Sequence, residues 1–279
     1  MFSFPTLHTR LDDGVLAVRI DAPPINLIGP DLVRDLVGLI RALPGEPGVR
    51  VVVFESADPD FFIPHVDLTK VPEYTAEAGK AGGPGDAALG LLFRTLSQVP
   101  PVTIAKVRGR ARGAGSEFVL ACDMSFASAE TAVFCQIEVG TGAPPGAGGV
   151  RHLARKLGRG RALEALLSAA DFDAPLAERY GWINRALPDA DLDSFVTTLA
   201  RRIAAFPPAG VHAAKQVVND LTLPGQDEFR ADAHRFQQLV AAPEAQSRIR
   251  ALLAQGLQTR GPAELDLPSH LASLPAAGA

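Results

Sequence analysis

The chain has 279 residues, of which 47% are hydrophobic and 21% charged, so it can bury a full-sized core and does not have the composition of a disordered protein. Its 27 basic and 31 acidic residues give a net charge of −4, which argues against binding nucleic acid through bulk charge. The absence of an 18-residue apolar run, of a signal-peptide pattern in the first 11 residues and of more than two cysteines predicts a cytoplasmic globular protein that does not bind membranes.

The first quarter of the chain predicts strands that alternate with a helix. Residues 15–21 are mostly apolar and β-branched, which predicts a strand, and two prolines end it. A helix is expected to begin at Pro30, because apolar side chains recur on one helical face at Leu32, Leu36, Ile40 and Leu43. Residues 49–55 are nearly all apolar, as in a strand buried on both faces. This order favours an α/β layer architecture.

The middle of the chain continues this alternation. After a short apolar stretch at 61–67, residues 73–88 are rich in Gly and Ala without periodicity and predict a mobile loop. The further predicted elements are a helix at 89–99, a strand at 102–107, a glycine-rich turn at 109–115, a buried helix at 116–122 and a strand at 124–128.

Beyond residue 150 the pattern becomes mainly helical. Helices are predicted at 161–169, 192–206, 211–221 and 228–256, with a short strand at 182–187. The last segment, 261–279, is rich in Pro and Ala, and we expect it to be loosely held.

Two glutamates stand in apolar surroundings. Glu117 opens an otherwise apolar helix, and Glu138 lies in the apolar segment 134–139. A carboxylate in such a setting is costly unless it is paired or protonated, so its pKa rises toward the range useful for general acid–base catalysis. Simpler interpretations stay open: Glu117 can merely stabilise its own helix dipole, and Glu138 can be an exposed residue on a half-buried strand.

Small residues precede the helix that carries Glu117. Gly113, Ala114 and Gly115 lie between a predicted strand and that helix, where backbone N–H groups can approach a ligand as an oxyanion hole requires. A tight turn is the simpler interpretation. The sequence contains no metal-binding spacing of histidines, nucleophile elbow or phosphate-binding loop, so these chemistries lose their usual signals.

Three segments carry distinctive patterns of proline, glycine and acidic residues: PPVTIA at 100–105, GRARGAGSEFVLACD at 109–123 and FCQIEVGTGAPPGAGGVRHL at 134–153. Shorter patterns stand at 24–27, 51–54 and 61–68. In order and spacing, from about residue 15 to residue 187, these segments resemble the enoyl-CoA hydratase/isomerase family, also called the crotonase superfamily.

The resemblance implies an α/β fold, a crotonase-like spiral of repeated ββα units with a helical C-terminal region. It divides the chain into a catalytic core at 1–190 that binds acyl-CoA and a helical region at 191–279 for trimerisation and closure of the site. It also implies an acyl-CoA thioester substrate, a homotrimer or a hexamer built from two trimers, and no metal or redox cofactor.

The resemblance also assigns the catalytic residues. The backbone N–H groups of Val66 and Ala114 correspond to the oxyanion hole that holds the thioester carbonyl. Glu117 and Glu138 match the two glutamates of the family's hydratases, which implies syn addition of water to a 2-enoyl-CoA. Glu117 would deprotonate the water that attacks the β-carbon, Glu138 would protonate the α-carbon, and Gly146 would help to place the water.

The loop at 61–68 departs from the family pattern, because Pro64, His65 and Val66 replace smaller residues. His65 is expected either to contact the substrate or to be an ordinary loop histidine. Leu68 is also expected to contact the substrate. Pro24 and Leu27 are expected to contact coenzyme A, although the lysine that the family often has near Pro24 is missing.

Two arginines differ from the family as well, and so do Cys135 and Ile137, which replace a glycine and a proline near the second glutamate. Arg110 and Arg112 are expected either to bind a phosphate of coenzyme A or an acidic acyl tail, or to be solvated or part of a subunit contact. Gln136 is expected to support the catalytic groups from behind, and Cys135 is expected to pack in the core.

The sequence thus predicts an enoyl-CoA hydratase, a lyase that adds water across the 2,3 double bond of an enoyl-CoA. The alternatives are another family reaction on an acyl-CoA, namely double-bond isomerisation, thioester hydrolysis or C–C bond cleavage, and a trimer that binds acyl-CoA without turnover.

Overall fold

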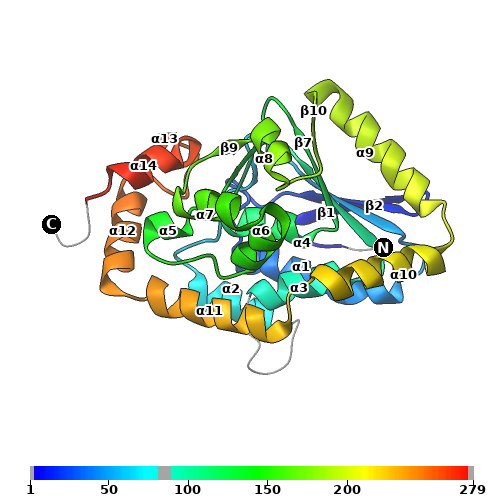
Figure 1. Ribbon diagram of the computed structural model, residues 1–279, viewed down its shortest axis with the longest axis horizontal. Coiled ribbons are helices and arrows are strands. Elements are labelled where there is room, and N and C mark those ends of the chain that lie inside the picture. The colour runs from blue at the N-terminus through cyan, green and yellow to red at the C-terminus, as the bar shows by residue number, and fades with distance from the viewer. Residues whose placement is uncertain (1–2, 81–88, 276–279) are drawn as a thin grey trace.

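The computed structural model describes residues 3–80 and 89–275, which form two β-sheets surrounded by helices (Figure 1). The larger sheet has six strands in the order β1-β2-β3-β5-β7-β10, and the smaller has four in the order β4-β6-β8-β9. The strands are β1 (Leu7–Asp12), β2 (Val15–Ile20), β3 (Val51–Ser56), β4 (Phe61–Ile63), β5 (Val102–Val107), β6 (Arg110–Arg112), β7 (Met124–Ser128), β8 (Val133–Cys135), β9 (Phe172–Asp173) and β10 (Arg185–Leu187).

The helices lie between and after these strands. They are α1 (Pro30–Ala42), α2 (Val71–Gly79), α3 (Leu89–Gln98), α4 (Ala114–Ala121), α5 (Glu138–Thr141), α6 (Gly149–Leu157), α7 (Arg159–Leu167), α8 (Ala174–Tyr180), α9 (Asp189–Ala204), α10 (Pro208–Thr222), α11 (Gln226–Val240), α12 (Pro243–Ala254), α13 (Pro262–Leu265) and α14 (Leu267–Ser273), with a 3₁₀ turn, η1 (Leu43–Gly45), after α1.

Each successive pair of strands places one strand in the larger sheet and one in the smaller sheet. The first strand of each pair (β3, β5 and β7) joins the larger sheet in parallel, and the second (β4, β6 and β8) joins the smaller sheet in parallel. A helix then leads to the next pair, so the chain advances as a spiral of ββα units. The predicted α/β class and ββα spiral are therefore confirmed.

The all-apolar sequence of β3 reflects burial on both of its faces. Val51 and Val53 pack with Leu192 and Val196 of α9, whereas Val52 joins the main core beneath α1, α3 and α4. Side chains alternate across a strand, so a strand covered by helices on both sides needs apolar residues at every position.

The start of α4 fits closely against the smaller sheet. A Cβ at Gly115 would stand 1.9 Å from the carbonyl oxygen of Ile63, so only glycine allows this approach. Gly113 has φ +50°, a conformation that also favours glycine. Phe118, one turn further on, packs edge-on against Phe54 and Phe93 at ring-centroid distances of 5.0 and 5.6 Å. The N-terminus of α4 is thus fixed beside the loop after β4.

Two predictions for the middle of the chain are wrong. Within the predicted loop at 73–88, residues up to Gly79 belong to α2, which begins with Pro72 in its first turn and buries Tyr74 and Ala78; residues 81–88 lie outside the described part of the chain. The predicted turn at 109–115 contains β6, which pairs with β4 and β8. Both segments were predicted as a loop or turn because they contain several glycines.

Three differences concern the ends of the chain. Strand β1, which the sequence analysis did not predict, pairs antiparallel with β2. The helix predicted at 228–256 is divided into α11 and α12, because Pro243 cannot continue the hydrogen bonding of α11. The tail predicted to be loose at 261–279 forms α13 and α14, which bury Glu264, Leu267 and Leu271, and its residues 276–279 lie outside the described part of the chain.

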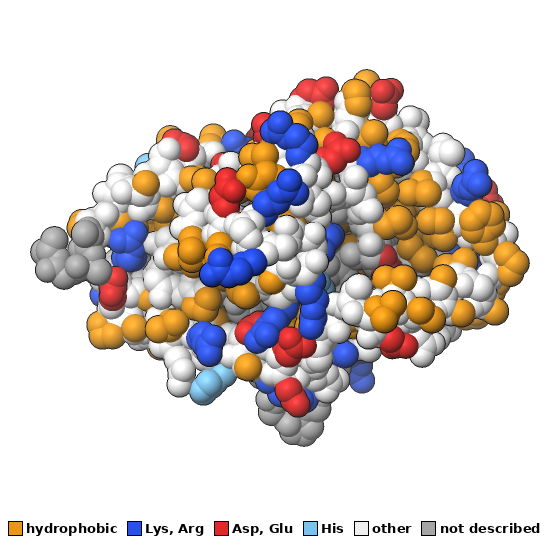
Figure 2. Space-filling view, viewed as in Figure 1, with side chains coloured by type: hydrophobic (Ala, Val, Ile, Leu, Met, Phe, Trp, Pro, Cys, Tyr) orange, Lys and Arg blue, Asp and Glu red, His pale blue; other side chains and the backbone are white. Residues whose placement is uncertain are grey.

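The helices after residue 190 do not share one role. Helix α9 covers the larger sheet, α11 lies beside α3, and α10 has no buried residue. Figure 2 shows hydrophobic side chains gathered over α9 and α10, where Phe206, Val217, Val218 and Leu221 are exposed. Within residues 3–80 and 89–275, none of the helices has the length and hydrophobicity needed to cross a membrane.

Candidate active site

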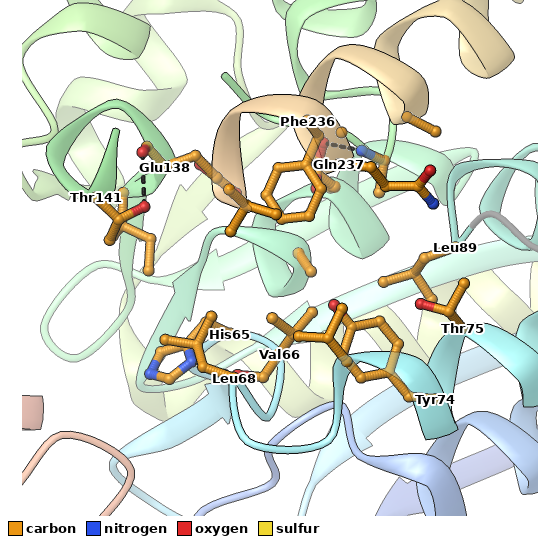
Figure 3. A pocket seen from close by; sticks show the side chains of 18 residues that line it. His65, Val66, Leu68, Tyr74, Thr75, Leu89, Glu138, Thr141, Phe236 and Gln237 are labelled. Carbon is orange, nitrogen blue, oxygen red and sulfur yellow. Dashed lines mark hydrogen bonds between the residues drawn. The ribbon is translucent and has the colours of Figure 1, made fainter. Parts of the chain in front are cut away.

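A cavity lies where α2, α4, α5 and α11 meet the loop after β4 (Figure 3). It encloses about 770 Å³ of empty space, part of it open to solvent. Its walls are mostly apolar, and the polar groups that reach them are few, as is usual for a small-molecule site. Of the residues singled out in the sequence, the cavity is lined by His65, Val66, Leu68, Ala114, Glu117, Glu138 and Gly146.

Glu117 lies in the first turn of α4 and is 2% exposed. Its Oε1 accepts hydrogen bonds from the backbone N–H groups of Ala147 at 2.7 Å and Gly149 at 2.8 Å. Burial raises the pKa of Glu117 to about 7, against the lowering effect of these two N–H groups. The carboxyl can therefore accept a proton near neutral pH.

Glu138 begins α5, shortly after the end of β8 at Cys135, and it lines the same cavity. The interpretation of Glu138 as an exposed strand residue is wrong, because it is helical and 8% exposed. Among the described residues its Oε2 has no hydrogen-bond partner. Burial, and then the nearby charge of Glu117, raise the pKa of Glu138 well above its ordinary value. Two such carboxyls titrate as a pair, so one of them keeps a proton.

Val66 and Ala114, whose backbone N–H groups are the predicted oxyanion-hole donors, also line this cavity. Ala114 is the first residue of α4, so its N–H has no acceptor within the helix. Val66 bridges to Ile28, but the bridge uses the carbonyl of His65 and the N–H of Asp67, which leaves the N–H of Val66 outside it. A carbonyl oxygen placed between the two N–H groups would meet the donor arrangement of an oxyanion hole.

The His65 ring does not face the cavity freely. Its Nδ1 lies 2.7 Å from the carbonyl oxygen of Val66, and its Nε2 lies 2.7 Å from Oε1 of Glu264. In Figure 3 the ring is directed away from Tyr74. Both nitrogens are thus taken up by the protein, and the predicted substrate contact of His65 runs at most through its backbone and Cβ.

Pro24 and Leu27 are not among the residues that line this cavity. Pro24 is exposed and Leu27 half-buried, and their predicted contact with coenzyme A stays a prediction. Gly146 lines the cavity beneath Phe236, where a Cβ would stand 2.6 Å from Cβ of Phe236. Any larger residue at 146 would therefore collide with α11.

The two arginines bind the C-terminal part of the chain. Arg112 is fully buried, and it binds the carboxylate of Asp171 at 2.5–2.8 Å and the carbonyl oxygen of Glu264 at 2.5 Å. Arg110 donates from Nε to the carbonyl oxygen of Leu265 at 3.1 Å. The interpretations of Arg112 as a solvated residue and as a phosphate-binding residue are therefore both wrong, because its guanidinium is buried in an internal ion pair.

Gln136 lies behind the two glutamates. Its Nε2 donates to Oγ of Ser116 at 3.1 Å, and that hydroxyl also receives the indole N–H of Trp182 at 3.2 Å. The same Nε2 and Oε1 of Glu117 each lie about 3 Å from the place where a Cβ of Gly149 would stand. Gln136 and Gly149 thus enclose Glu117 from one side, in keeping with the predicted supporting position. Cys135 is fully buried, and burial raises the pKa of its thiol well above the ordinary value.

The model of the enoyl-CoA hydratase/isomerase family matches residues 10–257 of the chain. The chain belongs to this family. The short-chain-enoyl-CoA hydratase of Clostridium acetobutylicum is 30% identical over 207 residues, which cover 74% of this chain and 77% of that protein. The crotonyl-CoA hydratase of Syntrophomonas wolfei is 29% identical over 220 residues, 78% of this chain and 83% of that protein.

Among solved structures, a "putative enoyl-CoA hydratase" from Streptomyces avermitilis is 62% identical, with a TM-score of 0.98 and 99% of each chain covered. An enoyl-CoA hydratase from Mycobacterium avium subsp. paratuberculosis is 23% identical, with a TM-score of 0.79 over 91% of this chain and 97% of that chain. The first similarity extends over the C-terminal helices as well as the ββα spiral.

Several groups at this cavity were not predicted from the sequence. Tyr74 and Thr75 of α2, and Phe236 and Gln237 of α11, reach the cavity from helices that the motifs do not include. Their only sequence signal is a polar or aromatic residue on a mostly apolar helical face. Among residues 3–80 and 89–275, no cluster of three or more His, Cys, Asp or Glu side chains is arranged to hold a metal ion.

Proposed function

We propose that this protein is an enoyl-CoA hydratase that adds water across the 2,3 double bond of an enoyl-CoA thioester. The single observation that carries the proposal is the pair Glu117 and Glu138 at one buried cavity that Val66 and Ala114 also line. Relatives in the same family are named enoyl-CoA and crotonyl-CoA hydratases, which supports this reaction over others.

The unequal surroundings of the two carboxyls support different roles for them. Two backbone N–H groups stabilise a negative charge on Glu117, whereas nothing in the described chain does so for Oε2 of Glu138. Glu117 is then the ionised member that removes a proton from the attacking water. Glu138 is the protonated member that donates a proton to the α-carbon.

Each step of the proposed reaction balances. The water oxygen bonds to the β-carbon while its proton passes to Glu117, and the electrons of the double bond move toward the thioester oxygen. The N–H groups of Val66 and Ala114 stabilise that oxygen. Protonation of the α-carbon by Glu138 completes the 3-hydroxyacyl-CoA, and a proton moves from Glu117 to Glu138 to restore the starting state. The proposal needs no metal or redox cofactor, since coenzyme A enters as part of the substrate.

The polypeptide also offers a surface for self-association. Helix α10 buries none of its residues, and its exposed face carries Val217, Val218 and Leu221. Contiguous apolar surface of this kind suits a subunit interface, which supports a homotrimer or hexamer and the trimerising role of residues 191–279 as parts of the proposal. A cytoplasmic location is a further part of the proposal. Light scattering on the purified protein measures the number of subunits.

The test is a spectrophotometric assay with crotonyl-CoA and with longer or branched enoyl-CoA thioesters. Hydration removes the absorbance of the conjugated thioester, and we expect Glu117→Ala and Glu138→Ala each to abolish that change. An isomerase that uses one base would keep most of its activity after one of the two substitutions. Binding of acyl-CoA without any absorbance change would contradict hydration and favour a binding role.

A further inference from the structure

The loop that carries Val66 is bonded to a distant part of the chain, residues 256–266, here called the C-terminal segment. The side chain of Gln258 makes two of these bonds: its Oε1 accepts the N–H of Leu68 at 2.8 Å, and its Nε2 donates to Oδ1 of Asp67 at 2.8 Å. Nearly two hundred residues of sequence separate the partners. One side chain of the C-terminal segment therefore holds the two residues that follow Val66.

A buried pair makes the third connection. Nε2 of His65 and Oε1 of Glu264 lie 2.7 Å apart across 199 residues of sequence, and the two residues are 2% and 0% exposed. The same Oε1 accepts the N–H of Gln258 at 2.7 Å. The other ring nitrogen of His65 lies 2.7 Å from the carbonyl oxygen of Val66. The network thus closes on itself, from Gln258 through Glu264 and His65 to the backbone of Val66.

The chemistry of these contacts indicates where the protons lie. A carbonyl oxygen only accepts, so Nδ1 of His65 must carry a hydrogen toward Val66. A second hydrogen on Nε2 lets the ring donate to Glu264 as well, and the doubly protonated ring is then paired with the carboxylate. A neutral ring has only one hydrogen and could donate to Val66 or to Glu264 but not to both.

We propose that His65 and Glu264 are positioning residues for the oxyanion hole, so that the N–H of Val66 is aligned only while the C-terminal segment is docked. The backbone of residue 66 is held on two sides, by the bridge to Ile28 on one and by the His65 ring on the other. This inference rests on the proposed function, because it assigns a part to Val66 in that reaction. Hydrogen-bond donors that point at a developing oxyanion stabilise the transition state much less when they are displaced.

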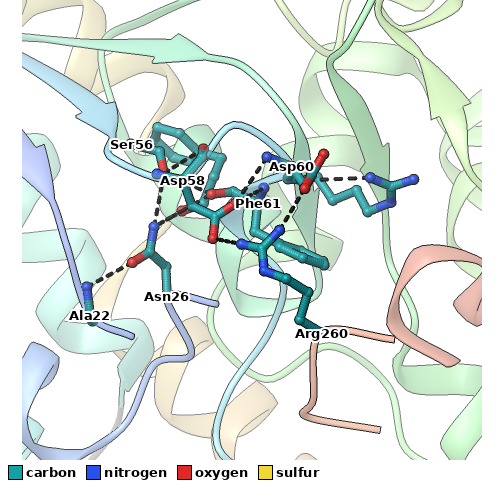
Figure 4. A network of polar contacts seen from close by, with 9 residues as sticks. Ala22, Asn26, Ser56, Asp58, Asp60, Phe61 and Arg260 are labelled. Atoms are coloured by element: carbon teal, nitrogen blue, oxygen red, sulfur yellow. Dashed lines mark hydrogen bonds and ion pairs between the residues drawn. The ribbon is translucent and has the colours of Figure 1, made fainter. Parts of the chain in front are cut away.

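Other contacts dock the C-terminal segment without reaching residues 65–68. Arg260 lies between the carboxylates of Asp58 and Asp60, with its guanidinium 5.3 Å from the ring centre of Phe61 (Figure 4). Arg112 and Arg110 bind the carbonyl oxygens of Glu264 and Leu265. Arg260 is therefore a matched control: it belongs to the same segment and forms ion pairs, but it has no bond to the loop.

The main test compares wild type with Glu264→Gln. Glutamine keeps the shape of the side chain but removes the charge that pairs with the doubly protonated ring. A neutral His65 can donate to Val66 and accept from the new side-chain amide only if that amide no longer accepts the N–H of Gln258, so the network loses one of its bonds. We expect kcat for crotonyl-CoA hydration to fall about 10- to 100-fold with a much smaller change in KM, since an oxyanion donor acts on the transition state. Arg260→Gln should stay within about threefold of wild type in kcat.

Hydrogen–deuterium exchange gives a second readout that does not depend on catalysis. In Glu264→Gln we expect faster backbone exchange both in peptides covering 64–70 and in peptides covering 256–266. In Arg260→Gln the loop peptides should exchange as in wild type. If wild type hydrates no enoyl-CoA, the proposed function fails, while the exchange experiment still decides whether the segment holds the loop.

A milder variant keeps the inference testable if Glu264→Gln does not fold. Gln258 has φ +68°, which a non-glycine residue adopts only under strain, so Gln258→Gly removes the amide bonds to Asp67 and Leu68 while it relieves the backbone. We expect faster exchange at 64–70 and a smaller fall in kcat. Wild-type kcat and wild-type loop exchange in the folded variants would overturn the proposal, as would faster exchange confined to the C-terminal segment.

Discussion

Glu117 and Glu138 line one buried cavity, yet the protein supports their charges unequally. Oε1 of Glu117 accepts two backbone N–H groups at 2.7 and 2.8 Å, whereas Oε2 of Glu138 has no hydrogen-bond partner in the part of the chain that the structure describes. Burial raises both pKa values, and the charge of Glu117 raises that of Glu138 further. A pair of carboxyls with this asymmetry can hold a base and an acid side by side at one pH.

The burial of Glu138 should lower the stability of the folded protein, although the proposed reaction requires this buried carboxyl. A carboxyl whose pKa is raised by folding weakens the folded state at every pH above its ordinary value of 4.5, and the loss grows until the folded pKa is reached. Glu138→Gln removes this penalty. We expect it to raise the free energy of unfolding by about 1–3 kcal/mol at pH 7.5 and by little near pH 4.5, while hydration is lost.

Chemical denaturation at the two pH values measures this effect. Glu244→Gln is the control, because Glu244 is exposed on α12, and its substitution should change the unfolding free energy by less than about 0.5 kcal/mol. A Glu138→Gln protein that is less stable than wild type at pH 7.5 would contradict the interpretation of Glu138 as a desolvated carboxyl.

The pH dependence of hydration should follow the same pair. The pKa of Glu117 is about 7, so kcat/KM is expected to rise through neutral pH as Glu117 loses its proton and to fall at higher pH as Glu138 loses its own. Asp232 contributes to the raised pKa of Glu117 through its charge. Asp232→Asn should therefore move the rising limb to lower pH.

Steady-state kinetics with crotonyl-CoA across the pH range test this expectation. A rising limb centred near the ordinary glutamate value of 4.5 would mean that Glu117 is not the desolvated base described above. A limb that stays in place in Asp232→Asn would show that the charge of Asp232 does not reach Glu117.

A single methyl group should displace Glu117. A Cβ at Gly149 would stand 3.0 Å from Nε2 of Gln136 and 3.1 Å from Oε1 of Glu117, and Gly149 also donates one of the two N–H bonds to that oxygen. We expect Gly149→Ala to lower kcat about 10- to 100-fold, because the base loses its position. The same assay on Gly160→Ala is the control, since a Cβ at that position in α7 meets nothing within 4 Å.

The control variant Gly160→Ala should affect stability and not activity. Gly160→Ala adds helix propensity in α7 and should leave kcat unchanged while it raises stability by up to about 1 kcal/mol. Equal kcat values for the two variants would mean that Gly149 does not constrain Glu117.

The parts of the site that local sequence encodes were predictable. Gly113, Gly115 and Glu117 follow one another around the start of α4, so a close backbone approach and a buried carboxyl both leave signals in one short segment. The strands of the larger sheet were equally clear, because burial on both faces demands continuous apolar runs. Glu138 was found, but its helix was not, since α5 has only four residues.

The contacts made by the C-terminal segment were not predictable. Glu264 meets His65 from a Pro- and Ala-rich stretch that has no periodicity, and Arg112 meets Asp171 across 59 residues. No local pattern announces a pair whose members are far apart in sequence. Arg112 was consequently interpreted as a surface or ligand-binding residue, although the ion pair with Asp171 buries it completely.

The pair of His65 and Glu264 should make stability depend on pH in a defined window. Burial lowers the pKa of His65, but the carboxylate of Glu264 outweighs it, so the pKa lies above 6.5; burial raises the pKa of Glu264, but His65 outweighs that and the pKa lies below 4.5. The contribution of His65 is thus complete below its ordinary pKa and is lost as pH rises through the folded value. The contribution of Glu264 is present above its ordinary pKa and is lost as pH falls through its lowered value.

Other charged groups lie near this pair and affect the protonation of the His65 ring. Arg112 lies on one side with its partner Asp171, and Asp67 lies on another through Gln258. Oε1 of Glu138 and Cβ of His65 lie within 3.0 and 3.5 Å of the point where a Cβ of Gly113 would stand, so Glu138 is also close. A negative charge on Glu138 favours the protonated ring, and the positive charge of Arg112 opposes it.

Unfolding free energies of wild type and Glu264→Gln, measured from pH 5 to 9, test the pair. We expect wild type to be more stable by about 3–5 kcal/mol where both charges are present, as for other buried pairs that lose one partner. The difference should shrink as pH rises through the raised pKa of His65, because the neutral ring no longer donates to Glu264. A difference that stays constant up to pH 9 would mean that His65 keeps its proton throughout, or that shape alone joins the two residues.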